Sequence, residues 1–230
     1  MNNDISIALR DSISQEILNA SSNLAEVGLD SIMEEGFLRE MPFISNVISV
    51  YKIQKSIRER HYIKKLGIFI SELNQGCVDE GKRQRIKSKI EESPKKRKKE
   101  LEYLLLLIDR YIAEGKAAML AKLYLAYLDK LISWDEVAKY AEVIDRLLPG
   151  DYEAMQETHW NDMNDSLVPD SLMRLIGLGM VISHDKDAAV PNTVGLLFIP
   201  SARTKDYELT AFGQKFLGCM QGELARDALE

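Results

Sequence analysis

The chain has 230 residues, of which 46% are hydrophobic and 29% are charged, and its net charge is −6. This composition is ordinary for a soluble globular protein and excludes a disordered or fibrous chain. The cysteines Cys77 and Cys219 lie far apart, and a disulfide scaffold would need more of them, so we expect a reducing, cytoplasmic compartment.

The N-terminal residues show no basic segment followed by an apolar run, so we expect no signal peptide. The longest apolar stretch with helical character, residues 41–51, is shorter than the ~20 residues that span a membrane.

Charge is divided unevenly along the chain. Residues 51–99 carry 16 Lys or Arg against 6 Asp or Glu, and the remaining residues carry 14 against 30. This division indicates either that the basic middle of the chain binds an anionic partner, or that it pairs with the acidic ends of the same chain or of a second copy.

Apolar residues recur at helical spacing through the first 150 residues, which predicts an N-terminal helical bundle. The predicted helices are residues 4–27, 30–40, 42–75 (as one helix, or as two with a break near Arg60), 79–91, 95–112, a segment from Met119 to Leu131, and a segment that reaches Leu147. Ser133 and Glu136 form a capping box that opens the last of these helices. Pro149 and Gly150 then stop it, so we place a domain boundary there and expect a bundle over residues 1–150.

Shorter and more varied elements are predicted after Gly150. They are a polar helix over residues 151–160, a helix over 171–177, strands over 180–183, 193–199 and 207–209, and a helix over 210–224. The predicted fold class is therefore mainly α, with the helical bundle followed by a small α+β domain over residues 151–230.

The run at residues 172–181, a β-hairpin, and the string Tyr-Glu-Leu-Thr-Ala-Phe-Gly at residues 207–213 resemble the recognition helix and wing of MarR- or PadR-like winged-helix domains. The resemblance implies a winged-helix-like domain with a candidate surface at Arg174, Lys186, Arg203 and Lys205. Such domains usually bind DNA. Here residues 151–230 hold 6 Lys or Arg against 13 Asp or Glu, which opposes phosphate binding, so we expect protein docking instead.

The N-terminal part loosely resembles uncharacterised bacterial helical proteins found on prophages and near defence genes. The resemblance is carried by an apolar helix that turns basic after residue 51 and by a helical hairpin over residues 118–147. It implies a bacterial protein in an antiviral-defence or mobile-element setting.

Ten cations between residues 82 and 99, which we call the basic tract, form the strongest candidate site. They are Lys82, Arg83, Arg85, Lys87, Lys89, Lys95, Lys96, Arg97, Lys98 and Lys99. A solvated helix face is one interpretation of the tract, and a nucleic-acid backbone site is the other. Because no aromatic residues interleave to stack bases, such a site would be independent of sequence.

Candidate chemistry is sparse. His61, His159 and His184 lie on separate predicted elements without metal-ligand spacing, and Gly177-Leu178-Gly179 follows a helix, which indicates a tight turn rather than a nucleotide-binding loop. We therefore identify no catalytic residue, metal, cofactor or small-molecule substrate, and the sequence favours a protein that is not an enzyme.

The expected function is a non-catalytic adaptor or regulatory subunit that acts through contacts with a protein partner or with its own copies. Two alternatives remain. One is sequence-independent nucleic-acid binding by the basic tract, and the other is association with a membrane surface through an apolar and basic helix over residues 42–65.

Overall fold

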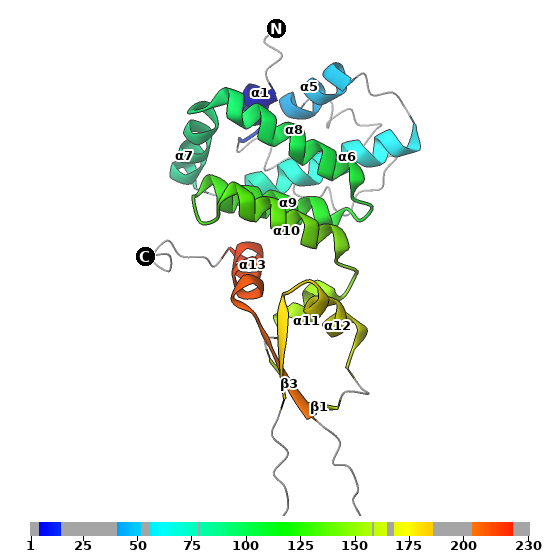
Figure 1. Cartoon of the computed structure of the whole chain (residues 1–230). Coiled ribbons are helices and arrows are strands. Elements are labelled where there is room, and N and C mark those ends of the chain that lie inside the picture. Colours follow the sequence, from blue (N-terminus) through cyan, green and yellow to red (C-terminus); the bar gives the residue numbers. More distant parts are fainter. Residues whose placement is uncertain are drawn as a thin grey trace, which may run out of the picture. The chain divides into compact units, whose positions relative to one another are not determined.

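The computed structural model describes residues 5–14, 41–51, 56–77, 79–157, 159–164, 168–185 and 204–222. The protein is mainly helical with a small antiparallel sheet in its C-terminal part, as the predicted mainly α class requires (Figure 1). Contacts divide the chain into two compact units between Asp145 and Arg146, whereas the sequence places its boundary at residue 150. We call the part that ends at Asp145 unit 1 and the part that begins at Arg146 unit 2.

Unit 1 is built from helices around a common apolar core. The described helices are α1 (Ile5–Asp11), α5 (Pro42–Tyr51), α6 (Ile57–Gln75), α7 (Glu80–Glu91), α8 (Pro94–Arg110), α9 (Gly115–Leu128) and α10 (Trp134–Arg146). Helix α6 packs on α9, and α1 packs on α5, α7 and α8. Leu66, Phe69 and Leu120 are fully buried in this core. None of the helices in the described part of the chain is both long and apolar enough to cross a membrane.

The predicted helix over residues 4–27 is wrong in its length, because α1 ends at Asp11 and residues 12–14 are not helical. Side chains from distant elements bind the backbone at this point. Asn74 donates to the Ser12 carbonyl and accepts from the Ser14 amide, and Ser12 Oγ accepts from the Phe43 amide. The rest of this segment and the predicted helix over residues 30–40 lie outside the described residues.

Residues 42–75 form two helices rather than one, so the apolar and basic segment over residues 42–65 is not a single helix either. Ser56 is the N-cap of α6, with extended backbone angles, and its side chain accepts a hydrogen bond from the Glu59 amide. Glu59 in turn bonds the Ser56 amide, which completes a capping box. The break therefore precedes the one predicted near Arg60, at a Ser-x-x-Glu signal that the sequence contains.

Other helix ends agree with their local signals. The capping box between Ser133 and Glu136 is present at the start of α10, Pro94 is the first residue of α8, and Gly76 ends α6. Each of these signals lies at the helix end that it marks or within four residues of it, which is why the sequence predicts these ends.

Unit 2 contains a three-stranded antiparallel sheet and short helices. Its elements are α11 (Asp151–Gln156), β1 (His159–Asn164), α12 (Asp170–Gly177), β2 (Val181–Asp185), β3 (Thr204–Leu209) and α13 (Ala211–Gln221). The strand order is β1-β3-β2. On the inner face of the sheet, Trp160, Val181 and Tyr207 are buried.

The predicted helix over residues 151–160 is wrong at its C-terminal end. Helix α11 ends at Gln156, and β1 follows because it pairs with β3, with Trp160 opposite Tyr207. A local sequence pattern does not predict the pairing of β1 with β3, because the two strands are far apart in the sequence. The predicted strands over 180–183 and 207–209 correspond to β2 and β3, while the strand predicted over 193–199 lies outside the described residues.

Candidate functional site

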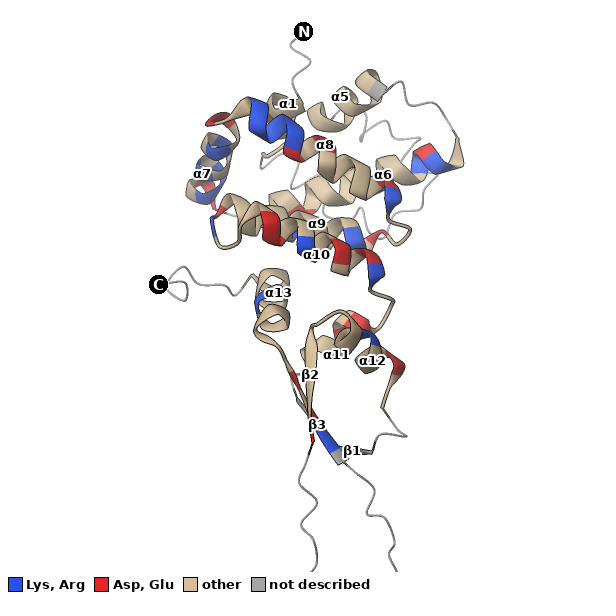
Figure 2. Cartoon of the chain, in the orientation of Figure 1, with Lys and Arg blue, Asp and Glu red and all other residues tan. Residues whose placement is uncertain are grey.

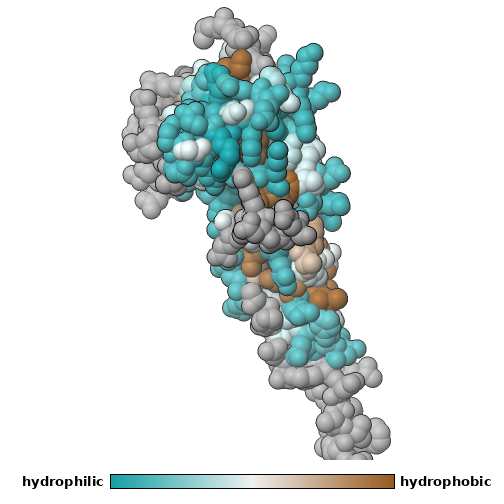
Figure 3. Space-filling model, turned by 90° about the vertical axis from the view of Figure 1, so that its left-hand side faces the viewer, coloured by the Kyte–Doolittle hydropathy of each residue, from teal (hydrophilic) through white to brown (hydrophobic). Residues whose placement is uncertain are grey.

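The basic tract lies on α7 and on the first turns of α8, two successive helices that pack against each other (Figure 2). The side of unit 1 that carries α7 has a largely hydrophilic surface (Figure 3). The ten cations nevertheless differ in burial and in partners, and these differences separate structural residues from residues that a partner can reach.

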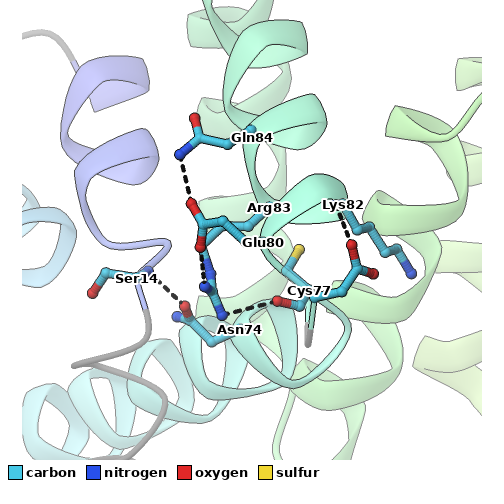
Figure 4. Close-up of polar contacts among 8 residues, drawn as sticks. Ser14, Asn74, Cys77, Glu80, Lys82, Arg83 and Gln84 are labelled. Carbon is cyan, nitrogen blue, oxygen red and sulfur yellow. Dashed lines mark hydrogen bonds and ion pairs between the residues drawn. The ribbon is translucent and has the colours of Figure 1, made fainter.

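Arg83 anchors the turn between α6 and α7. It is only 4% exposed and donates to the Cys77 carbonyl at 3.1 Å and to the Glu80 carboxylate at 2.6 Å (Figure 4). Asp79 caps α7 by accepting from the Lys82 amide at 2.7 Å. A guanidinium held in this way holds the fold together and is not exposed to an external phosphate.

Cys77 sits beside this network and is fully buried, and burial raises the pKa of its thiol to about 11. Because the unfolded thiol loses its proton near pH 9 and the folded one does not, the free energy of unfolding should fall as the pH rises from 9 to 11. We expect the thiol to account for a loss of about 2 kcal/mol by about pH 10.5. Urea unfolding of the wild type and of Cys77→Ala across this range measures it. A stability difference between the two proteins that does not change with pH would contradict the assignment.

Three cations of α7 surround Asp129, which follows the last residue of α9. Lys82, Arg85 and Lys89 approach its carboxylate at 3.9, 3.5 and 3.6 Å. Lys89 also donates to the Leu128 carbonyl. The C-terminal end of a helix carries partial negative charge, so these cations neutralise the end of α9 and tie α7 to it.

Arg97 is the buried residue of the second half of the tract. Its side chain donates to Glu100 at 2.5 Å and to the Lys89 carbonyl at 3.2 Å, and it lies 5.1 Å from the ring centre of Tyr127. The Tyr127 hydroxyl donates to the same Glu100 carboxylate at 2.6 Å. Both members of this ion pair are buried, so the cluster joins α8 to α9 from inside.

The remaining lysines of the tract face solvent to different degrees. Lys87 is half-buried, and Lys96 lies 3.8 Å from Glu100. Lys95, Lys98 and Lys99 are exposed, and none of them forms an ion pair within the described part of the chain. We call these three residues the lysine end of α8, and they are the part of the basic tract most available to a partner.

The four candidate residues of unit 2 do not form a basic surface among the described residues. Arg174 binds Asp151, with Nη2 at 2.8 Å from Oδ1 and Nε at 3.1 Å from Oδ2, and the Asp151 carboxylate raises the Arg174 pKa. Asp151 itself is fully buried. Lys205 lies 4.0 Å from Asp185. Lys186 and Arg203 lie outside the described residues.

The structure adds apolar surface residues that the sequence did not single out. Met173 on α12 is 57% exposed, and Ile182 on β2, an element that packs against α12, is 45% exposed. The outer face of the sheet also carries His184, which bonds Glu208 at 2.9 Å. The exposure of Met173 could be predicted from the sequence, because Met173 does not share the helical spacing that places Leu172 and Leu175 on the buried side of the helix.

A cavity of about 340 Å³ opens between the start of α6 and the second half of α8. Its lining combines apolar and acidic groups: Ser56, Arg58, Glu59, Tyr62, Glu102, Leu105, Leu106 and Asp109. Leu106 is 71% exposed beside it, and Arg58 pairs with Asp109 at 2.5 Å. None of these residues belongs to the candidate site predicted from the sequence.

The histidines that the structure describes with their side chains have ordinary partners. His61 lies 2.9 Å from the Ile112 carbonyl and 3.5 Å from Glu114, and His184 bonds Glu208. Within the described residues, no group of three or more His, Cys, Asp or Glu is placed to hold a metal ion. Comparisons with known proteins add nothing to this geometry, because no protein-family model, curated protein or solved structure matches the chain.

Proposed function

We propose that unit 2 is a winged-helix-like domain that docks onto a protein, and that the chain is a non-catalytic adaptor or regulatory subunit. The element order α11-β1-α12-β2-β3-α13 and the strand order β1-β3-β2 support this interpretation. So does the string at residues 207–213, in which β3 leads directly into α13. The loose resemblance of the N-terminal part suggests a bacterial defence or mobile-element setting.

The observation that carries the proposal is the pairing of Arg174 with the buried Asp151. Arg174 is the one Lys or Arg in α12, the helix that would be the recognition helix in this interpretation. With that guanidinium engaged internally, the exposed positions of α12 include Asp170 and Met173. Phosphate neutralisation supplies much of the affinity of proteins for DNA, and this surface offers little of it.

Exposed apolar residues on unit 2 favour protein docking. Met173 is exposed on α12, and Ile182 is exposed on the outer face of the sheet. Acidic residues lie near them, because Asp170 is exposed on α12 and Glu208, which is exposed on β3, is the register partner of Ile182. Apolar side chains surrounded by polar ones are typical of protein interfaces, and methionine adapts well to a partner's shape.

Substitution of Met173 tests the proposal. We expect Met173→Asp to reduce recovery of the native partner at least about tenfold in quantitative co-purification from the host, because a carboxylate would be buried at an apolar contact. The matched control is Ile112→Asp in unit 1, which places the same carboxylate at another exposed apolar residue (87% exposed) and should leave recovery of the partner unchanged. An unchanged set of recovered proteins with Met173→Asp, or tight DNA binding that depends on Arg174, would overturn the proposal.

Nucleic-acid binding is the second candidate, and the exposed lysine end of α8 is the observation that favours it. Arg83 and Arg97 are buried, and Lys82, Arg85 and Lys89 face Asp129. A nucleic-acid site would therefore be confined to a few lysines. It would require binding to mixed-sequence DNA that falls steeply between about 50 and about 200 mM salt.

The membrane-surface alternative has weaker support. In α5, Phe43, Ile44 and Val47 are buried in unit 1. Of the cations that follow, Lys64 binds Glu114 at 2.8 Å, and Lys65 donates to the carbonyls of Asp109 and Tyr111. The apolar and cationic groups that a membrane would need are thus largely used within the fold.

A further inference from the structure

The exposed side of α8 carries opposite charges at its two ends. Residues at alternating steps of four and three form a single stripe along it: Lys95, Lys99, Glu102, Leu106 and Asp109. This spacing keeps a stripe on one side of a helix and allows a second helix to pack along it. The first half of the stripe is cationic, and the second half is acidic and apolar.

The first turn of α8 is unfavourable for the lysines that it carries. The N-terminus of a helix carries partial positive charge that acts mainly on its first turn, so it repels Lys95 and Lys96. Ser93, the N-cap, makes no side-chain capping bond, and α8 has no acidic residue in its first turn. An external negative charge would remove this repulsion.

The cavity beside Leu106 has the chemistry to accept a lysine. Tyr62, Leu105 and Leu106 provide apolar walls for an aliphatic stem, and Glu102 lies among them. Arg58 also lines the cavity, but its charge is paired with Asp109 at 2.5 Å. Glu102 forms no hydrogen bond or ion pair with any residue that the structure describes. Lysine side chains commonly lie with the stem on apolar surface and the ammonium group at its edge.

We propose that two copies of the chain form a symmetric dimer through antiparallel packing of their α8 helices. A twofold axis between the levels of Glu100 and Leu101 places Lys99 opposite the partner's Glu102. The same axis places Lys95 opposite the partner's Leu106, at the cavity. Lys99 then meets the partner's Glu102 and Lys95 meets the apolar wall of the partner's cavity, so one self-complementary surface satisfies both copies.

A polyanion such as DNA would use the lysines but not the rest of the stripe. Glu102 follows Lys99 by three residues, about 4.5 Å along the helix, and would repel a phosphate bound at that lysine. A second copy gives a role to the lysines, to Glu102 and to the cavity at once, so these observations favour it. The dimer uses unit 1 alone and does not depend on the docking function proposed for unit 2.

Sedimentation velocity of the full chain, at protein concentrations from about 1 to about 300 μM, measures the dimer directly. We expect dimers at about 50 mM salt and dissociation at about 500 mM, where charge pairs are screened. Lys99→Glu and Glu102→Lys should each weaken the dimer at least about 100-fold, because each places like charges opposite one another. The double variant with both substitutions should restore it, because both intermolecular pairs are then reversed. Lys139→Glu, an equal charge change at an exposed site on α10, should leave the dimer intact.

Circular dichroism of each variant separates loss of the dimer from loss of folding. A monomer at every concentration and salt overturns the proposal, and so does a dimer that is indifferent to Lys99→Glu and Glu102→Lys. A folded monomer that binds mixed-sequence DNA through Lys95, Lys98 and Lys99 would assign the lysine end to nucleic acid and would equally overturn it.

Discussion

Replacing Gly213 by alanine is expected to destabilise unit 2 by about 3 kcal/mol, through overpacking against backbone atoms. A Cβ atom at this position would lie 2.2 Å from the Met180 carbonyl oxygen and 3.1 Å from its carbon. That carbonyl cannot move away cheaply, because it accepts a hydrogen bond from the Thr210 amide at 2.9 Å. Urea unfolding of the two proteins measures the difference.

Gly177 provides the matched control in the same unit. No heavy atom lies within 4 Å of a Cβ placed there, and its backbone is helical. Gly177→Ala should therefore be neutral or slightly stabilising, since alanine favours the helix. Similar losses at both glycines, or no loss at Gly213, would contradict the close approach of α13 to Met180.

The string at residues 207–213 shows which structural features a local sequence pattern can predict. Tyr207 and Leu209 are buried on one face of β3, and Thr210 caps α13 by accepting from the Gly213 amide at 3.0 Å. All of these roles depend on spacings of two or three residues. The transition from strand to helix is therefore predictable from the sequence, whereas the reason for glycine at 213 requires the position of Met180.

Elements that depend on distant partners were not predictable in the same way. Strand β1 exists because it pairs with β3, and α1 ends early because Asn74 binds the backbone of Ser12 and Ser14. These contacts join residues about 40 to 60 positions apart, so a local sequence pattern does not reveal them. The break at Ser56 is different, because its capping box is local and the sequence contains the Ser-x-x-Glu signal for it.

The candidate site was only partly predictable because charge counts ignore the direction of side chains. Arg83 lies three residues before Ile86, and Arg97 lies four before Leu101, so each arginine falls on the buried stripe of its helix. That spacing is a local signal for burial. The cavity beside Leu106 depends on the packing of α6 against α8 and has no such signal.

Adjacent residues of the basic tract should consequently differ strongly in how much their substitution lowers the free energy of unfolding. Arg97→Ala is expected to lower the free energy of unfolding by about 3 kcal/mol, because it leaves the Glu100 carboxylate buried without its closest cation. Lys98→Ala, at an exposed position with no ion pair among the described residues, should change it by less than about 0.5 kcal/mol. Urea unfolding at neutral pH gives both values.

Equal effects of Arg97→Ala and Lys98→Ala would show that the Arg97–Glu100 pair contributes no more than a surface contact. A large effect confined to Arg97 has a practical consequence for any study of the tract. Neutralising all five residues from Lys95 to Lys99 would damage the packing of α8 against α7 and α9, because Arg97 bonds the Lys89 carbonyl on α7 and lies over the Tyr127 ring on α9. Loss of binding in such a variant would then report unfolding. Substitutions at Lys95, Lys98 and Lys99 alone change the surface while the buried cluster with Tyr127 stays intact.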